Sequence, residues 1–334
     1  MKLLDMKKIL LGATMALALL ACGRKPAPVH TSYDTLPAWA ASEGGYSYTL
    51  PVQEVHSARY LIFDGLLPDG SLQVNGRTVK AGQGGVAPSV VPLSGWLQFG
   101  QNQLRVQGEP FPGPVRLLEA SKLYFSPEYY GVQRIHAFVS DVRDSSALLY
   151  VKAWIRNADP VNRKADVKLV LKDADGLPVA EGSQTLYVAS HHTERFVHTL
   201  RVPHPHLWNG REDPYLYRLE ASTGTDQISV ELGIRTRERG PEGLLLNGRP
   251  VPEEEGRIVE LSDYPITHSR LSEYDREGIL VRISAPAEEA AARMPALVTE
   301  FSVHPCVAEW VAPEADLYRQ LRMRDPYRPL LYRP

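Results

Sequence analysis

Side chains that could bind a metal or carry out nucleophilic catalysis are scattered along this sequence. The densest histidine set comprises His191, His192, His198, His204 and His206. Zinc requires three or four converging ligands, so we predict surface or strand histidines here and no metal site. The DADG segment at residues 173–176 begins like a calcium loop but lacks the later ligands, so it predicts a turn. No glycine-rich phosphate loop is present, and serine, histidine and aspartate are too dispersed to define a triad. We therefore expect no cofactor.

The N-terminus has the pattern of an export signal. Lys2, Lys7 and Lys8 precede an apolar run at residues 9–21, which is shorter than the roughly 20 residues of a membrane-spanning helix. Small residues before Cys22 resemble the bacterial lipobox, in which the cysteine is lipidated. The alternative is an ordinary signal peptide with an incidental cysteine. We expect a signal peptide at residues 1–22, a lipid anchor at Cys22, a tether at residues 23–39, and a location at the bacterial cell envelope, in the outer membrane or periplasm.

The composition is that of a soluble globular protein. The chain has 43% hydrophobic and 23% charged residues, and its formal net charge of −2 gives no basic field for nucleic acid. Twenty-seven prolines and 25 glycines favour many short strands joined by turns, hence a mainly β fold. With Cys22 lipidated, Cys306 has no disulfide partner, so stability must come from packed cores.

Two regions show the periodicity of half-buried strands. In residues 40–125, Asn75-Gly76 separates two strand-like runs, which is the strongest short-range hairpin signal. In residues 126–240, Leu149, Val151 and Ala153 alternate with polar or large residues, as a sandwich strand requires. Trp96 in the first region could stack on a pyranose ring or fill the core.

An ordered set of short motifs links these regions to a known family. The motifs are RYLIFDG, SLQVNGRTV, GQGG and GQNQLRV in the first region, then LW at 207–208, PYLY at 214–217, LGIR at 232–235 and GLLLNGRPV at 243–251. The series resembles family 2 glycoside hydrolases, the β-galactosidase, β-glucuronidase and β-mannosidase group. The resemblance implies a jelly-roll sugar-binding-like domain at residues 40–125, an immunoglobulin-like β-sandwich at residues 126–240, and entry into a (β/α) barrel after that.

Residues 241–334 resemble pieces of that barrel. The pieces are SDYP at 262–265, YDREGILV at 274–281, HPCVAEW at 304–310 and DPYRP at 325–329. A complete (β/α)8 barrel needs roughly 250 residues, so we expect a truncated TIM-barrel remnant here.

The resemblance also indicates where catalytic groups would lie. The family carries its acid/base in an Asn-Glu pair after the tryptophan of the fourth strand, whereas this chain has Pro313-Glu314 at a spacing one residue shorter. Glu314 is therefore either a displaced acid/base or a structural glutamate at a helix start. Glu300 precedes His304, where the family has a different run, so it is not expected to be the nucleophile. The nucleophile strand is absent. Asp263 replaces a family histidine and, with Trp96, is a candidate for substrate contact.

Three functional hypotheses follow. The chain is an envelope lipoprotein that is catalytically degenerate and serves a carbohydrate-associated or scaffold role. It is alternatively a residual or partner-completed retaining β-glycosidase acting on O-glycosyl bonds, or a non-functional truncated gene product. The expected partners are a glycan, the membrane through the Cys22 lipid, and a protein that covers the incomplete barrel.

Overall fold

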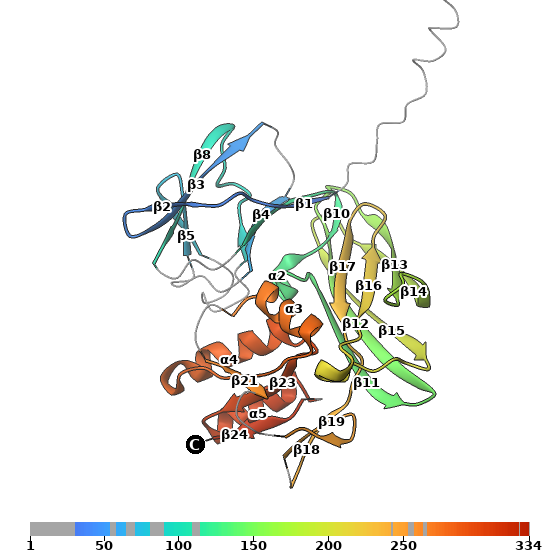
Figure 1. Ribbon diagram of the computed structural model, residues 1–334. Helices are drawn as coiled ribbons and strands as arrows, with labels where there is room; N and C mark the ends of the chain where they lie inside the picture. Colours follow the sequence, from blue (N-terminus) through green and yellow to red (C-terminus); the bar gives the residue numbers. More distant parts are fainter. Residues whose placement is uncertain are drawn as a thin grey trace, which may run out of the picture. The chain divides into compact units, whose positions relative to one another are not determined.

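The computed structural model describes residues 31–53, 58–64, 71–80, 90–108, 114–241, 243–252, 257–262, 266–326 and 328–333. The fold is mainly β, as predicted, and its strands and helices are labelled in Figure 1. The predicted lipidation site Cys22 and the predicted contact residue Asp263 lie outside the described residues.

The first β-sandwich consists of two antiparallel sheets. One sheet has the order β1-β9-β4-β7 and the other β2-β3-β8-β5-β6. Their bounds are β1 Ser32–Thr35, β2 Ala40–Ser42, β3 Gly45–Val52, β4 Ala58–Phe63, β5 Ser71–Val74, β6 Arg77–Lys80, β7 Val90–Pro92, β8 Gly100–Gln107 and β9 Val115–Ala120. The predicted hairpin is confirmed: β5 pairs with β6 through Asn75 and Gly76, whose φ angles of 50° and 78° meet the needs of a two-residue turn.

The expected tether at residues 23–39 is too long. Ser32–Thr35 forms β1, which pairs antiparallel with β9 along its whole length. The strand escaped prediction because it is only four residues long, and its partner lies more than 80 positions away in the sequence. The first sandwich therefore begins inside the segment that composition assigned to a linker.

The second β-sandwich spans the region predicted to be immunoglobulin-like. Its sheets are β10-β12-β11, with β15 on the other edge of β12, and β14-β13-β16-β17. Their bounds are β10 Leu123–Phe125, β11 Ile135–Arg143, β12 Ser146–Asn157, β13 Arg163–Lys172, β14 Pro178–Val188, β15 Thr193–Pro203, β16 Tyr217–Ser222 and β17 Gln227–Leu232. A short helix α2 (Pro127–Tyr130) precedes β11, and a 3-10 turn η1 (Gly210–Glu212) precedes β16. The alternation along β12 is confirmed, because Leu149, Val151 and Ala153 are all buried.

The last third contains parallel strands, unlike the sandwiches before it. A small antiparallel sheet of β18 (Arg237–Gly240), β19 (Gly243–Leu246) and β20 (Arg249–Pro250) comes first. Four parallel strands then follow in sequence order: β21 Ile258–Leu261, β22 Leu280–Ile283, β23 Val307–Ala312 and β24 Leu330–Tyr332. Helices α3 (His268–Glu277), α4 (Ala287–Phe301) and α5 (Ala315–Arg324) connect them, coloured orange to red in Figure 1. We call this region the parallel unit.

Helix α3 begins and ends for local reasons. Thr267 caps α3, since its hydroxyl accepts a hydrogen bond from the backbone of Arg270. Gly278 ends that helix in the left-handed conformation, at φ 68°. Among the described residues, no helix is both long and apolar enough to cross a membrane.

Trp208, from the predicted LW motif, joins the second sandwich to the parallel unit. It is fully buried, and its indole belongs to the core of the parallel unit rather than to that of the sandwich. Its Nε1 donates a hydrogen bond to the carbonyl of Asp275 in α3, at 2.9 Å. A Cβ on Gly233 would come within 2.8 Å of Trp208 and Pro305, so only glycine permits this approach.

Candidate functional site

The predicted site residues that the structure describes lie in separate parts of the chain. Trp96 is half-buried in the first sandwich, packs against its core, and has Arg77 over its ring at 4.6 Å. Glu314 is exposed and occupies the N-cap position of α5, one residue before the helix begins. Its side chain makes no capping hydrogen bond. Trp96 thus belongs to the first core and Glu314 to the parallel unit.

A row of alternating charges crosses the parallel sheet. Glu260, Arg282 and Glu309 occupy neighbouring register positions on β21, β22 and β23. Arg282 Nη1 lies 2.6 Å from the Glu260 carboxylate, and its Nη2 lies 2.6 Å from Glu309. Arg239 from β18 approaches Glu309 from the other side, with Nε at 2.6 Å. The two glutamates are therefore held by arginines. We call this set the charge row.

The charge row keeps Glu309 ionised. Burial alone would raise its pKa, but hydrogen bonds from Arg239 and Arg282 outweigh burial and lower it. A carboxyl with a lowered pKa holds no proton near neutrality, so Glu309 cannot act as a general acid. The neighbouring residues Val281 and Ile283 belong to the apolar core instead, which places the row on one face of the sheet.

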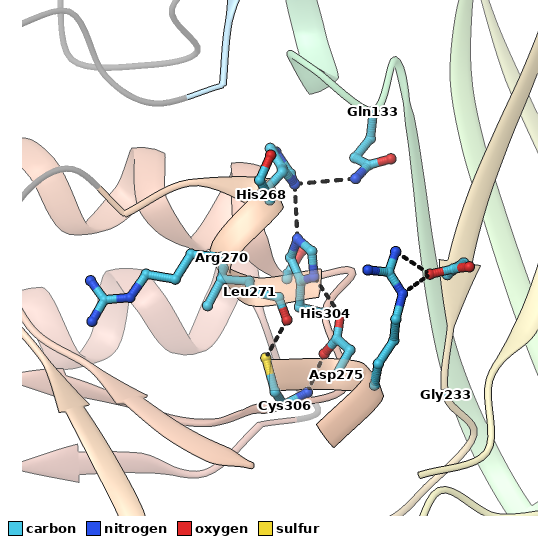
Figure 2. Close-up of polar contacts among 12 residues, drawn as sticks. Gln133, Gly233, His268, Arg270, Leu271, Asp275, His304 and Cys306 are labelled. Carbon is cyan, nitrogen blue, oxygen red and sulfur yellow. Dashed lines mark hydrogen bonds and ion pairs between the residues drawn. The ribbon is translucent and has the colours of Figure 1, made fainter. Parts of the chain in front are cut away.

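A chain of four titratable side chains is buried between α3, α4 and the loop before β23. His268 Nε2 lies 2.7 Å from Glu300 Oε1, and His268 Nδ1 lies 2.8 Å from His304 Nε2. His304 Nδ1 in turn lies 2.6 Å from Asp275 Oδ2. Figure 2 shows this sequence from His268 through His304 to Asp275. All four side chains are less than a tenth exposed, and we call them the histidine–carboxylate chain.

Backbone groups fix both ends of this chain. At one end, Asp275 Oδ1 accepts a hydrogen bond from the backbone of Cys306 at 2.7 Å, also visible in Figure 2. At the other, Glu300 Oε1 accepts one from the backbone of Val132 in the second sandwich at 3.0 Å. A Cβ on Gly131 would lie 2.2 Å from Glu300, so the loop before β11 can approach this carboxylate only as glycine. The histidine–carboxylate chain therefore connects the parallel unit to the second sandwich through Glu300 and Val132.

Burial shifts the pKa of two groups at the Asp275 end of the histidine–carboxylate chain. Burial lowers the pKa of His304, against the opposing influence of Asp275. Burial also raises the pKa of the Cys306 thiol well above its ordinary value, so this cysteine is not a nucleophile near neutrality.

An arginine-rich cluster lies beside this chain. Arg235 and Arg328 are buried, and both donate hydrogen bonds to the carbonyl of His304. Arg328 also pairs with Asp325, whose pKa falls to about 2 because Arg328, Arg237 and a bond from Trp310 outweigh the effect of burial. Burial lowers the pKa of Arg235 to about 9. Asp325 is thus the carboxylate that pairs directly with Arg328, whereas Arg235 donates to the carbonyls of Gly233 and His304.

Sequence reasoning missed the histidine–carboxylate chain. The sequence pattern that could have revealed it lies on α3, where His268, Leu271 and Asp275 follow the spacing of one helix face. Leu271 indicates that this helix face is buried, so His268 and Asp275 on the same face indicate a buried polar network. The partners Glu300 and His304 come from elsewhere in the sequence, so the contacts themselves required the fold.

The histidines at positions 191–206 do not converge. His206 Nε2 lies 2.5 Å from Asp213 and its ring stacks on Tyr215, whereas His192 contacts the carbonyl of Ser190. Within the part of the chain that the structure describes, no group of three or more histidine, cysteine or acidic residues is arranged to hold a metal ion.

Sequence comparison relates this chain to known glycosidases. Residues 133–235 match the family model for glycosyl hydrolases family 2. A β-galactosidase from Yersinia enterocolitica is 24% identical over 86% of this chain and 35% of its own length, and one from Psychromonas ingrahamii is 25% identical over 60% of this chain and 21% of its own. The chain thus spans about a third or less of the length of these curated relatives.

Solved structures share the architecture described above. A putative β-galactosidase from Bacteroides fragilis superposes with a TM-score of 0.74 at 18% identity, covering 85% of this chain and 54% of that protein. A β-glucuronidase from Bacteroides uniformis gives a TM-score of 0.73 at 17% identity, covering 85% and 46%. The family model and the curated relatives thus relate this chain to the glycosyl hydrolases of family 2, and the solved structures show that it shares their fold.

Proposed function

We propose that this chain is a lipid-anchored envelope protein that associates with glycans and does not hydrolyse them. The match of residues 133–235 to a glycosidase family supports the link to carbohydrate. The proposed absence of hydrolysis rests on the charge row, in which arginines bind the glutamates of the parallel sheet.

Retaining hydrolysis makes specific demands on carboxyl groups. One must hold a proton to give to the leaving oxygen, and a second must lie about 5–5.5 Å away as nucleophile. Glu309 is kept anionic by Arg239 and Arg282. Glu300 is buried against His268, and Glu314 is exposed at a helix start. None of these three environments suits a proton donor poised beside a substrate.

The test is a hydrolysis assay with a control for contaminating enzyme. The full chain is incubated with chromogenic β-galactosides, β-glucuronides and β-mannosides, in parallel with Glu314→Gln. We expect no release of chromophore above that of heat-treated protein. Turnover by the wild-type chain that Glu314→Gln abolishes would refute the proposal and identify Glu314 as the acid/base.

The anchor requires a separate experiment. Replacing Cys22 by alanine removes the lipidation site but leaves the described fold untouched. We expect the wild-type protein in the membrane fraction of a bacterial host and Cys22→Ala in the soluble fraction. Equal membrane partition of both would rule out a lipid at this residue.

A partner-completed retaining β-glycosidase is the second candidate. The observation that favours it is the parallel sheet itself: within the described residues, β21 and β24 each pair with a single strand, so each leaves an open edge. Further strands, from a protein partner or a longer chain, could pair there. A stable complex that hydrolyses a glycoside, when the isolated chain does not, would support this candidate. A non-functional gene product would instead show a protease-sensitive parallel unit, which limited proteolysis detects.

A further inference from the structure

A polar cleft of about 440 Å³ lies where the two sandwiches meet α3. Its volume is within the range of small-molecule sites, and sites of this kind are common at domain junctions. Strands β1 and β9 supply Tyr33 and Arg116, the loop before β11 supplies Arg134, and α3 supplies Arg276. We call it the arginine cleft. It is distinct from the charge row, because Glu260, Arg282 and Glu309 do not line it.

Arg116 has hydrogen-bonding capacity that the fold does not use. Its side chain is 22% exposed, and the nearest carboxylate oxygen, on Asp64, is 3.7 Å from Nη1. This distance is too long for a hydrogen bond, and Nη1, which is itself buried, donates none to the described residues. Asp64 itself accepts hydrogen bonds from the backbone and hydroxyl of Ser269. The positive charge of Arg116 is therefore only partly compensated.

Arg134 provides a rigid second cation. It is buried, it adopts a positive φ of 56°, and its Nη1 lies 2.9 Å from Asp226. Its Nε has no hydrogen-bond partner among the described residues. The guanidinium sits 4.5 Å from the ring centre of Tyr33, and Arg116 lies 5.9 Å from the same ring. The Tyr33 hydroxyl donates to the carbonyl of Val132 at 3.0 Å, so the aromatic ring that both cations approach is fixed.

The balance of charge in the lining is positive. Three guanidinium groups line the cleft against one carboxylate, that of Glu273. Arg276 is 58% exposed and shares Glu231 with Arg218, so its charge reaches the cleft mouth. The remaining polar groups are the imidazole of His268 and several hydroxyls and amides, including Ser272 and Gln227. Such groups donate to and accept from sugar hydroxyls, whereas guanidinium groups bind carboxylate or sulfate in pairs of hydrogen bonds.

We propose that the arginine cleft binds an acidic saccharide, a sugar unit bearing a carboxylate or sulfate group. The acidic group would lie beside Arg116 and Arg276, and the sugar hydroxyls would face the serine and glutamine side chains. This proposal rests on the proposed association with glycans and gives that association a site and a ligand class.

The chain offers a matched pair of variants for the test. Arg276 and Arg218 are equally exposed at 58% and both pair with Glu231, but only Arg276 lines the arginine cleft. Binding of a galacturonate trisaccharide, a sulfated disaccharide and a neutral galactose trisaccharide is measured by calorimetry on the full chain. The proteins are wild type, Arg116→Gln, Arg276→Gln and Arg218→Gln, each first checked for a native melting curve.

We expect saturable binding of an acidic sugar, weakened about tenfold by Arg116→Gln and about threefold by Arg276→Gln, since a charged hydrogen bond is worth more when partly buried. Arg218→Gln should bind as wild type does, and affinity should fall as salt rises. Binding of the galacturonate trisaccharide alone would identify a carboxylate ligand, and binding of the sulfated disaccharide alone would identify a sulfate ligand.

Other outcomes overturn the proposal in distinguishable ways. Glycan binding that none of the cleft variants changes, or that is confined to the neutral sugar, refutes the cleft while leaving glycan association intact. No binding to any of the three sugars refutes both. Product release from a bound acidic sugar refutes the non-hydrolytic function but not the cleft.

Discussion

Acid should destabilise this protein through His136, which lies on β11 at the contact with the parallel unit. The imidazole is partly buried, with ring centres of Tyr130 and Phe138 at 5.4 and 5.6 Å. Its Nδ1 lies 3.2 Å from the hydroxyl of Ser302. Burial lowers the pKa of His136 from 6.5 to about 4, and the positive charges of Lys152 and Arg328 act in the same direction. The imidazole is therefore neutral in the folded protein at pH 7.

The sign of the effect follows from the direction of this shift. In the unfolded chain His136 takes up a proton below its ordinary pKa of 6.5, whereas the folded protein resists protonation until about pH 4. Between these values the unfolded state binds more protons, so the free energy of unfolding falls as the pH falls. One pKa unit corresponds to about 1.4 kcal/mol, so His136 alone should remove roughly 2.5 kcal/mol at about pH 4.5. The lowered pKa of His304 adds to the loss with the same sign.

The assay compares urea unfolding at about pH 8 and pH 4.5 for three proteins. His136→Gln keeps a hydrogen-bonding group near Ser302 but cannot be protonated. His191→Asn is the control, since His191 is exposed and its φ of 55° is tolerated by asparagine. We expect His136→Gln to lose roughly 2.5 kcal/mol less than wild type on acidification, and His191→Asn to follow wild type. An equal acid loss in His136→Gln and wild type would refute the reasoning.

Three further predictions test a buried ion pair, a close backbone contact and a buried thiol. Asp325→Asn should lower the free energy of unfolding by about 3–5 kcal/mol, because it leaves buried guanidinium groups uncompensated; urea unfolding measures this. Gly278→Ala places a Cβ 2.2 Å from the backbone of the 3-10 turn η1. The melting temperature of this variant should therefore fall well below that of Gly248→Ala, because Gly248 has a similarly positive φ but no neighbouring atom within 4 Å. In a Cys22→Ser background, the Cys306 thiol should stay unreactive toward a disulfide reagent until the protein is unfolded, because it is buried and its pKa is raised. Reaction at the rate of a free thiol under native conditions would contradict that burial.

Features set by neighbouring residues could be predicted from the sequence. The Asn75-Gly76 turn needs positive φ at both positions, which few other pairs allow, and the structure has both. The alternation along β12 follows from a sheet with one buried face. The family resemblance also predicted a mainly β fold with β-sandwiches, which the structure and its family 2 neighbours share.

Features set by distant residues could not be predicted in this way. Trp208 looked like part of the sandwich, yet its indole lies in the core of the parallel unit. The histidine–carboxylate chain joins His268 on α3 to Glu300 on α4, and periodicity alone cannot reveal which helix faces pack together. The arginine cleft draws Tyr33 and Arg276 from opposite ends of the chain. Sequence spacing carries no information about such contacts.

Arginine side chains are central to both proposals, but they act at two separate places in the structure. In the parallel sheet, Arg239 and Arg282 surround Glu309 and fix its charge, which opposes the proton transfer that a glycosidase acid must perform. In the cleft, the nearest carboxylate to Arg116 is too distant for a hydrogen bond, so the charge of Arg116 is only partly compensated. In our two proposals, arginine thus opposes proton transfer in one place and favours the binding of an anion in another. Loss of binding in Arg116→Gln, with an unchanged hydrolysis assay, is the combined result that this arrangement requires.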